Sequence, residues 1–111
     1  MAIYNTSLQN TATAISPVSV SDIAITVMFF CNNNTPDPLD ANFGKQLVSV
    51  HVVPSGGSVS NENRIVNQVP VDAGDTFVFG AERLVLSAGD TIHALTSDNN
   101  AISVTISYVV I

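Results

Sequence analysis

The residues best able to do chemistry in this 111-residue chain are two histidines, one cysteine and nine acids. His51 and His93 each lie inside a run of alternating or apolar residues of the kind that forms a strand. Acid-base catalysis or metal binding would need a carboxylate partner or further ligands, and the sequence places none at a suitable spacing. We therefore expect both to be structural or surface histidines.

Cys31 is the only cysteine, so it can form neither an intrachain disulfide nor a zinc cluster or CxxC redox pair. It follows an apolar stretch that ends in Phe30 and precedes three asparagines, and no basic neighbour is placed to activate it as a nucleophile. We expect a buried or half-buried thiol at the end of a strand.

Four aspartates are the remaining candidate ligands. Asp72, Asp75, Asp90 and Asp98 could gather at one end of a sheet, where several carboxylates could hold Ca²⁺. Their spacing matches neither an EF-hand nor the RTX nonapeptide, so turn formation is the expected role and bound calcium is left open. No GxSxG elbow, phosphate-binding glycine loop or pair of cleft carboxylates is visible either. We predict a non-enzymatic protein without catalytic, cofactor-binding or metal-binding residues.

The charge balance limits the partners. Charged residues make up 11% of the chain and the net charge is −6, so the basic surface that neutralises nucleic-acid phosphates or anionic lipid is missing. Disorder needs low hydrophobicity, whereas 46% of the residues are hydrophobic. No secretory signal or membrane-spanning run is visible. We expect a folded domain that binds neither nucleic acid nor membranes and whose neutral Ser, Thr and Asn surface suits contact with copies of itself or other subunits.

Strands must position these side chains, because Val, Ile and Thr are abundant and no stretch repeats apolar residues at helical spacing. The clearest alternation, apolar against hydroxylated, runs over residues 102–110. Turn signals near every tenth residue predict an all-β fold, an antiparallel β-sandwich of jelly-roll-like or immunoglobulin-like type with about seven or eight strands. The other expected strands are 23–31, 47–53, 65–71, 76–79, 84–86 and 91–96, with 12–20 as an edge strand broken near Pro17.

The segment 23–31 is the most apolar of these strands. Alternation places Ile25, Val27 and Phe29 on one face, and Met28 and Phe30 on the other. Both faces become apolar towards its end, which is typical of a strand covered on both sides.

The phrase Ala-Gly-Asp-Thr occurs twice, at residues 73–76 and 88–91. It predicts a turn in which glycine takes a positive φ, aspartate bonds to nearby backbone, and threonine begins the next strand. We interpret the two copies as equivalent corners of a sheet.

Residues 1–10 carry no strand pattern and are expected to form an N-terminal arm in front of a single domain at 11–111. Ile3, Tyr4 and Leu8 are the expected anchors of this arm on neighbouring subunits. Four of the five phenylalanines are expected in the core. Phe43, which follows a long loop at 32–42, is the candidate for an exposed contact, because interface anchors tend to be aromatic. The alternative, which we favour for this residue, is that its ring anchors the loop against its own domain.

Short sequence segments follow one another in an order similar to that in one group of viral proteins. They lie at residues 52–58, 69–76, 84–92 and 104–107. Through them, residues 48–111 resemble the short β-sandwich proteins that bacteriophages place on the capsid, neck, tail or baseplate. Residues 1–42 match nothing in that pattern. The resemblance implies a non-enzymatic structural subunit of the virion that is assembled in the host cytoplasm. It also implies a homo-oligomer bound to major capsid, neck or tail proteins, as a capsid decoration or a neck or tail accessory.

The alternative is a carbohydrate- or receptor-binding β-sandwich module of an adhesion device. Sugar platforms usually need exposed aromatic rings, whereas this chain has no tryptophan, and Tyr4 and Tyr108 lie far apart in the sequence. We therefore prefer the assembly hypothesis.

Overall fold

Alternating apolar residues form strands here because one side of each strand is buried between two sheets. The computed structural model describes residues 2–16, 21–80 and 84–111, and these form nine strands and one short 3₁₀ helix. The predicted all-β sandwich is confirmed, with slightly more strands than expected. The elements are β1 (Ala2–Ser7), β2 (Thr13–Ala14), β3 (Ile23–Asn32), β4 (Gln46–Val53), η1 (Asn61–Asn63), β5 (Arg64–Val71), β6 (Thr76–Phe79), β7 (Leu84–Leu86), β8 (Thr91–Leu95) and β9 (Ile102–Val110).

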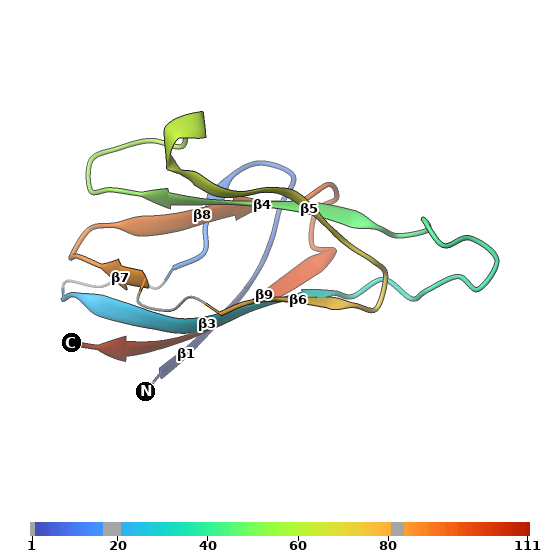
Figure 1. Ribbon diagram of the computed structural model, residues 1–111, viewed down its shortest axis with the longest axis horizontal. Coiled ribbons are helices and arrows are strands. Elements are labelled where there is room, and N and C mark those ends of the chain that lie inside the picture. Colours follow the sequence, from blue (N-terminus) through green and yellow to red (C-terminus); the bar gives the residue numbers. More distant parts are fainter. Residues whose placement is uncertain (1, 17–20, 81–83) are drawn as a thin grey trace.

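Two antiparallel sheets form the two layers of the molecule (Figure 1). Sheet A has the strand order β1-β9-β3-β6, with β7 also paired to β3, and sheet B has the order β2-β8-β4-β5. The pairs are nested along the chain, because β4 pairs with β5, β3 with β6, β2 with β8 and β1 with β9. This nesting defines a jelly roll, one of the two architectures that the sequence left open.

The first residues of the chain belong to sheet A. β1 pairs with β9 from Ala2↔Tyr108 to Ser7↔Ser103. Leu8, which follows β1, is fully buried, and the chain beyond it continues towards sheet B. Residues 1–10, which were expected to form an arm, therefore contain an edge strand of sheet A. Local patterning could not predict this pairing, because the partner strand β9 lies at the other end of the chain.

The segment 12–20 contributes the short strand β2 at the edge of sheet B. Ile15 is buried beside it, and the hydroxyl of Ser16 accepts a hydrogen bond of 2.9 Å from the N–H of Ile92. The edge position is therefore confirmed for β2, whereas the break expected near Pro17 lies outside the described residues.

A bulge in β3 exchanges the two faces of this strand. Its register with β9 shifts between Ile25 and Val27. Ile25 therefore points into the core before the bulge, while Met28 and Phe30 do so after it. Val27 and Phe29 lie on the outside, and Phe29 is 40% exposed. The prediction that Phe29 is one of four core phenylalanines is thus wrong, and no sheet formed by the described residues covers the outer side of β3.

The two Ala-Gly-Asp-Thr phrases form matching turns. Gly74 and Gly89 have φ angles of 78° and 91°, a region that favours glycine. The N–H groups of Asp75 and Asp90 close the turns with hydrogen bonds of 2.9 and 3.0 Å to the residues three positions earlier. The threonines begin β6 and β8, as predicted. The first turn leads from sheet B to sheet A and the second leads back, so the phrases mark corners between the sheets rather than within one sheet.

The core lies between the two sheets and draws on almost every strand. The rings of Phe30 and Phe77 pack within it, with centroids 5.8 Å apart. The buried cluster consists of Leu8, Ile15, Ile23, Ile25, Met28, Phe30, Val48, Val50, Val71, Leu86, Ile92, Ala94, Ile102, Val104 and Ile106.

Candidate docking surfaces

The structure separates the four residues expected at an interface. Ile3 in β1 is 67% exposed and Phe43 in the loop before β4 is 53% exposed. Tyr4 is half-buried and packs against the core, and Leu8 is fully buried. Ile3 and Phe43 are therefore available for contact, whereas Leu8 stabilises the core and is out of reach of a partner.

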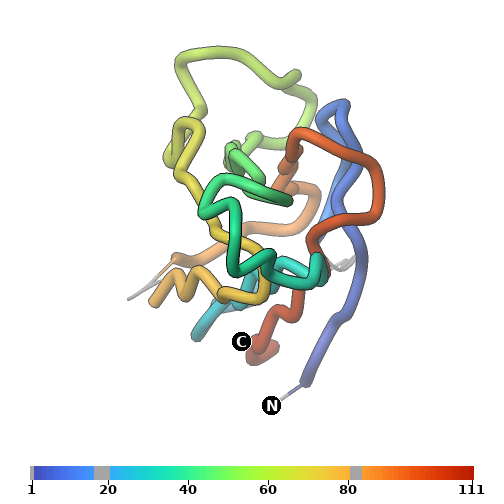
Figure 2. The backbone as a smooth tube through the Cα atoms, turned by 90° about the vertical axis from the view of Figure 1, so that its right-hand side faces the viewer, coloured from blue at the N-terminus to red at the C-terminus, as the bar shows by residue number. Residues whose placement is uncertain are grey.

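Residues 33–45 form a loop that projects beyond the sheets, at the right in Figure 1 and towards the viewer in Figure 2. Leu39 in this loop is 95% exposed, and Phe43 follows four residues later. The sequence pointed to Phe43 but not to Leu39, because a single leucine among prolines and aspartates carries no pattern. We call residues 33–45 the projecting loop.

Internal hydrogen bonds fix the shape of the projecting loop. The carboxylate of Asp37 accepts a hydrogen bond from the N–H of Leu39 at 2.9 Å, and that of Asp40 accepts one from the N–H of Asn42 at 3.0 Å. The N–H of Phe43 donates to the carbonyl of Asp40 at 3.1 Å. The two bonds to the carboxylates are turns of the Asx type, in which the aspartate side chain replaces a backbone acceptor. Leu39 and Phe43 are consequently held out on a preformed backbone.

Asn32, the last residue of β3, joins the base of the projecting loop to the sandwich. Its buried side-chain amide donates to the carbonyls of Gly44 and Val71 at 2.8 and 2.9 Å, and its oxygen accepts from the N–H of Asn34 at 3.0 Å. Gly44 has a φ of 72°, and a Cβ on it would lie 2.9 Å from the Cβ of Asn34. Glycine is therefore required at this close approach.

The side of sheet A that faces away from the core is a second uncovered surface. Its exposed apolar side chains include Phe29 in β3, Val78 in β6 and Val85 in β7, the last two being 51% and 52% exposed. A hydroxylated strip runs along β9 beside them. We call this surface the outer face of sheet A, and define it as Ile3, Asn5, Ser7, Ala24, Val27, Phe29, Cys31, Thr76, Val78, Val85, Ser103, Thr105, Ser107 and Val109.

Cys31 lies on this face as a half-buried thiol near the end of its strand, which confirms the sequence prediction for its position. Its sulfur lies 3.8 Å from the side-chain oxygen of Asn33.

The two histidines lie side by side on sheet B, since His51 in β4 is the direct register partner of His93 in β8. His51 is buried, and its Nδ1 lies 3.0 Å from both the carbonyl of Ser60 and the side-chain oxygen of Asn63. Both partners are acceptors, because the same Asn63 oxygen accepts from the N–H of Ser60 while its amide donates to Ser58. Nδ1 therefore carries a hydrogen and donates it, and His51 has the expected structural role of holding the loop after β4.

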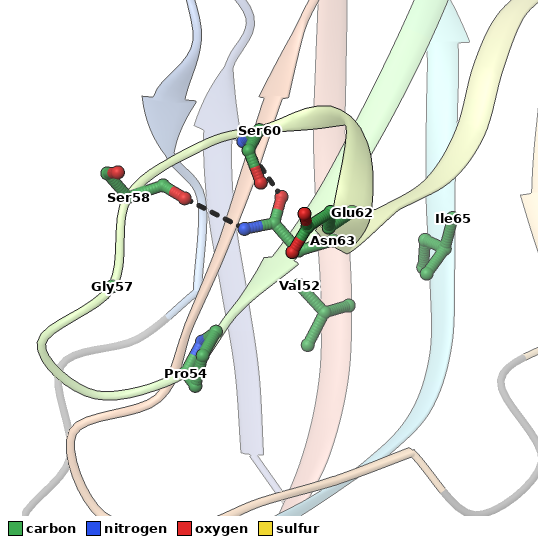
Figure 3. Close-up of a pocket in the computed structure, with 8 residues that line it drawn as sticks. All are labelled: Val52, Pro54, Gly57, Ser58, Ser60, Glu62, Asn63 and Ile65. Atoms are coloured by element: carbon green, nitrogen blue, oxygen red, sulfur yellow. Dashed lines mark hydrogen bonds between the residues drawn. The ribbon is translucent and has the colours of Figure 1, made fainter.

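A cavity of about 510 Å³ lies under that loop (Figure 3). Two hydrogen bonds of Asn63 hold its rim, one to the carbonyl of Ser58 and one from the N–H of Ser60. Glu62 provides the one carboxylate among the lining residues, and none of them is aromatic. The lining consists of Val52, Pro54, Gly57, Ser58, Ser60, Glu62, Asn63 and Ile65.

Three of the aspartates considered as calcium ligands make separate contacts. Asp72 lies 3.7 Å from the ammonium of Lys45, Asp90 accepts hydrogen bonds from two backbone N–H groups, and Asp98 accepts one from the side-chain amide of Gln46. Across residues 2–16, 21–80 and 84–111, no group of three or more His, Cys, Asp or Glu side chains is placed to hold a metal ion.

Fold and surfaces together define a jelly-roll sandwich with a projecting loop that exposes Leu39 and Phe43 at one end and an exposed outer face on sheet A. Neither a protein-family model nor a curated protein matches the chain. The part of the chain that the structure describes contains no helix long and apolar enough to cross a bilayer.

Proposed function

We propose that this protein is a non-enzymatic structural subunit of a bacteriophage particle, present in many copies and docked onto other virion proteins. The observation that carries the proposal is the projecting loop, which holds Leu39 and Phe43 out of the sandwich on a preformed backbone. An ordered loop loses little conformational entropy on binding, and exposed apolar side chains on it can fill a pocket of a partner.

Two further features support the same proposal. The jelly roll is a fold that recurs in viral capsid proteins, although it also occurs in lectins and cupins, so the fold alone does not decide the function. The phrases in residues 48–111 resemble small phage virion proteins, which favours the virion among these classes. Capsid decoration and a neck or tail accessory role both fit a small module that docks through a loop.

Particle composition tests the proposal directly. Phage particles are purified on a density gradient from a culture in which the gene for this protein is expressed from the phage genome that carries it. The amount of each protein in the particles is then quantified by mass spectrometry. We expect this chain to sediment with the particles in many copies per particle. Its absence from intact particles that hold the other structural proteins would refute the proposal.

The loop is tested with the double variant Leu39→Asp and Phe43→Asp, supplied in place of the native chain. Because both side chains are exposed, the variant should fold normally but be reduced at least about tenfold in the particles, as expected when apolar anchors become charged. Ile65→Asp is the matched control, since Ile65 is 45% exposed at the start of β5, which pairs with the end of β4 away from the loop. Equal incorporation of the double variant and the native chain would contradict the docking role of the loop.

A further inference from the structure

We propose that two copies of this chain associate through the outer face of sheet A, with the two faces packed against each other about a two-fold axis. This dimer goes beyond the proposed function and does not depend on it, because it uses a different surface from the projecting loop and is expected for the isolated protein.

The first argument is the composition of β3. Its sequence has apolar residues on both sides, as in a strand covered on both sides. The bulge directs Met28 and Phe30 into the core and leaves Val27 and Phe29 on the outer side, where Val27 is half-buried, Phe29 is 40% exposed, and no sheet among the described residues packs over them. The neighbouring edge strands continue the apolar surface with Val78 and Val85. A cover supplied by another chain would complete the burial that the sequence of β3 indicates.

The second argument is charge. Every charged side chain among the described residues lies in a connecting segment, in η1 or on sheet B, and none lies on the outer face of sheet A. A strongly charged partner would find no opposite charge on this face. A second copy presents the same neutral surface, so the two can meet without desolvating a charge. The described charged side chains are Asp22, Asp37, Asp40, Lys45, Glu62, Arg64, Asp72, Asp75, Asp90 and Asp98.

The third argument is area. Four strands spaced about 4.8 Å apart and about eight residues long at about 3.4 Å per residue cover about 500 Å². Two such faces bury about 1,000 Å², which reaches the lower limit for a specific interface and indicates a dimer of moderate affinity.

Symmetry then places Phe29 at the centre. In its row across the sheet, Phe29 lies between Val78 in β6 and Thr105 in β9. A two-fold axis that passes close to Phe29 brings the two rings together, and the sheets would stand about 10 Å apart, as stacked sheets do. Aromatic pairs of this kind add to the stabilisation from buried area.

Sedimentation equilibrium of the purified chain, from micromolar to several hundred micromolar protein, tests the proposal. We expect a reversible monomer-dimer equilibrium. The net charge of −6 repels the two copies from outside the interface, so raising the salt concentration should strengthen the dimer. A chain that stays monomeric over the whole concentration range would overturn the proposal.

The variant Val78→Asp locates the interface. Each dimer would bury two unpaired carboxylates, so the dissociation constant should rise by about 100-fold or more. Leu47→Asp, on the outer side of sheet B, should leave it unchanged. Thermal unfolding of both variants establishes that they are folded. A dimer weakened by Leu47→Asp but not by Val78→Asp would contradict the proposed face.

Crosslinking gives a second measurement that does not rely on loss of binding. In a Cys31→Ser background, Phe29→Cys should be joined into a covalent dimer by a short bismaleimide reagent, because the two thiols face each other near the axis across a gap of about 10 Å, too wide for a direct disulfide. Leu47→Cys in the same background is the control and should remain monomeric with the same reagent over the same time. Crosslinking at Leu47→Cys alone would refute the face-to-face arrangement.

Discussion

At the scale of single residues, two buried polar side chains make hydrogen bonds that the pattern of apolar residues could not predict. Asn32 and Gln46 are both buried. Asn32 was expected in a loop with its neighbours, and Gln46 lay just outside the expected strand at 47–53. Gln46 accepts hydrogen bonds from the hydroxyl of Thr96 and the N–H of Asp98 at 3.0 and 2.9 Å. Asparagine and glutamine are mostly exposed in proteins, so their burial here depends on hydrogen-bond partners that only the folded chain brings near them.

Asn32→Ala tests the anchor of the projecting loop. The substitution leaves the carbonyls of Gly44 and Val71 without this donor in a buried place, so the free energy of unfolding should fall by about 2–3 kcal/mol. Urea denaturation measures the change. Asn33→Ala is the control, because Asn33 is exposed, and it should cost less than about 0.5 kcal/mol. Equal losses in the two variants would show that Asn32 does not hold the loop.

At the scale of elements, local patterning predicted strands well and pairing poorly. The strands at 76–79, 84–86 and 102–110 have the expected bounds, and the strand expected at 23–31 extends one residue further, to Asn32. The strand β1 and the bulge in β3 were missed, because both depend on register with β9, far away in the sequence. The same dependence on pairing with a distant strand limits how much of the candidate docking surfaces could be predicted. Phe43 could be singled out as a candidate contact from its place in a loop, although packing against its own domain was the favoured expectation and the ring is 53% exposed. The exposure of Phe29 depends on which side of β3 the other sheet covers.

The pair Leu8→Ala and Ile3→Ala tests whether the start of the chain is structural. Leu8 is fully buried and Ile3 is 67% exposed. Leu8→Ala should lower the free energy of unfolding by about 3 kcal/mol through lost burial and the cavity that remains. Ile3→Ala should change it by less than about 0.5 kcal/mol at low protein concentration. Chemical denaturation of both variants gives the comparison. A small loss for Leu8→Ala would restore the interpretation of residues 1–10 as a separate arm.

At the scale of the whole molecule, spacing and turn signals were enough to predict a sandwich but not the nesting of its strand pairs. Nested pairing means that many contacts join residues far apart in the sequence, β1 with β9 above all. Such contacts must wait for large loops to close, which slows folding.

Refolding kinetics test this consequence of the jelly roll. Tyr4 and Tyr108 are the two tyrosines and lie in β1 and β9. Tyrosine fluorescence therefore reports on the pairing of these two strands, the outermost of the nested pairs. Stopped-flow dilution from urea should show refolding over milliseconds to seconds, with fluorescence and far-UV circular dichroism changing together. Refolding within microseconds would be inconsistent with rate control by these distant pairings.

The pairing of β1 with β9 also bears on how the protein is made in the cell. A ribosome that adds about 5–20 residues per second completes β9 several seconds after β1. During that interval β1 has no partner strand, and Leu8 has no complete core to enter. The nascent chain therefore exposes an open strand edge and apolar side chains until its last strand emerges. This is the stage at which chaperones would bind it and at which neighbouring nascent chains could pair wrongly.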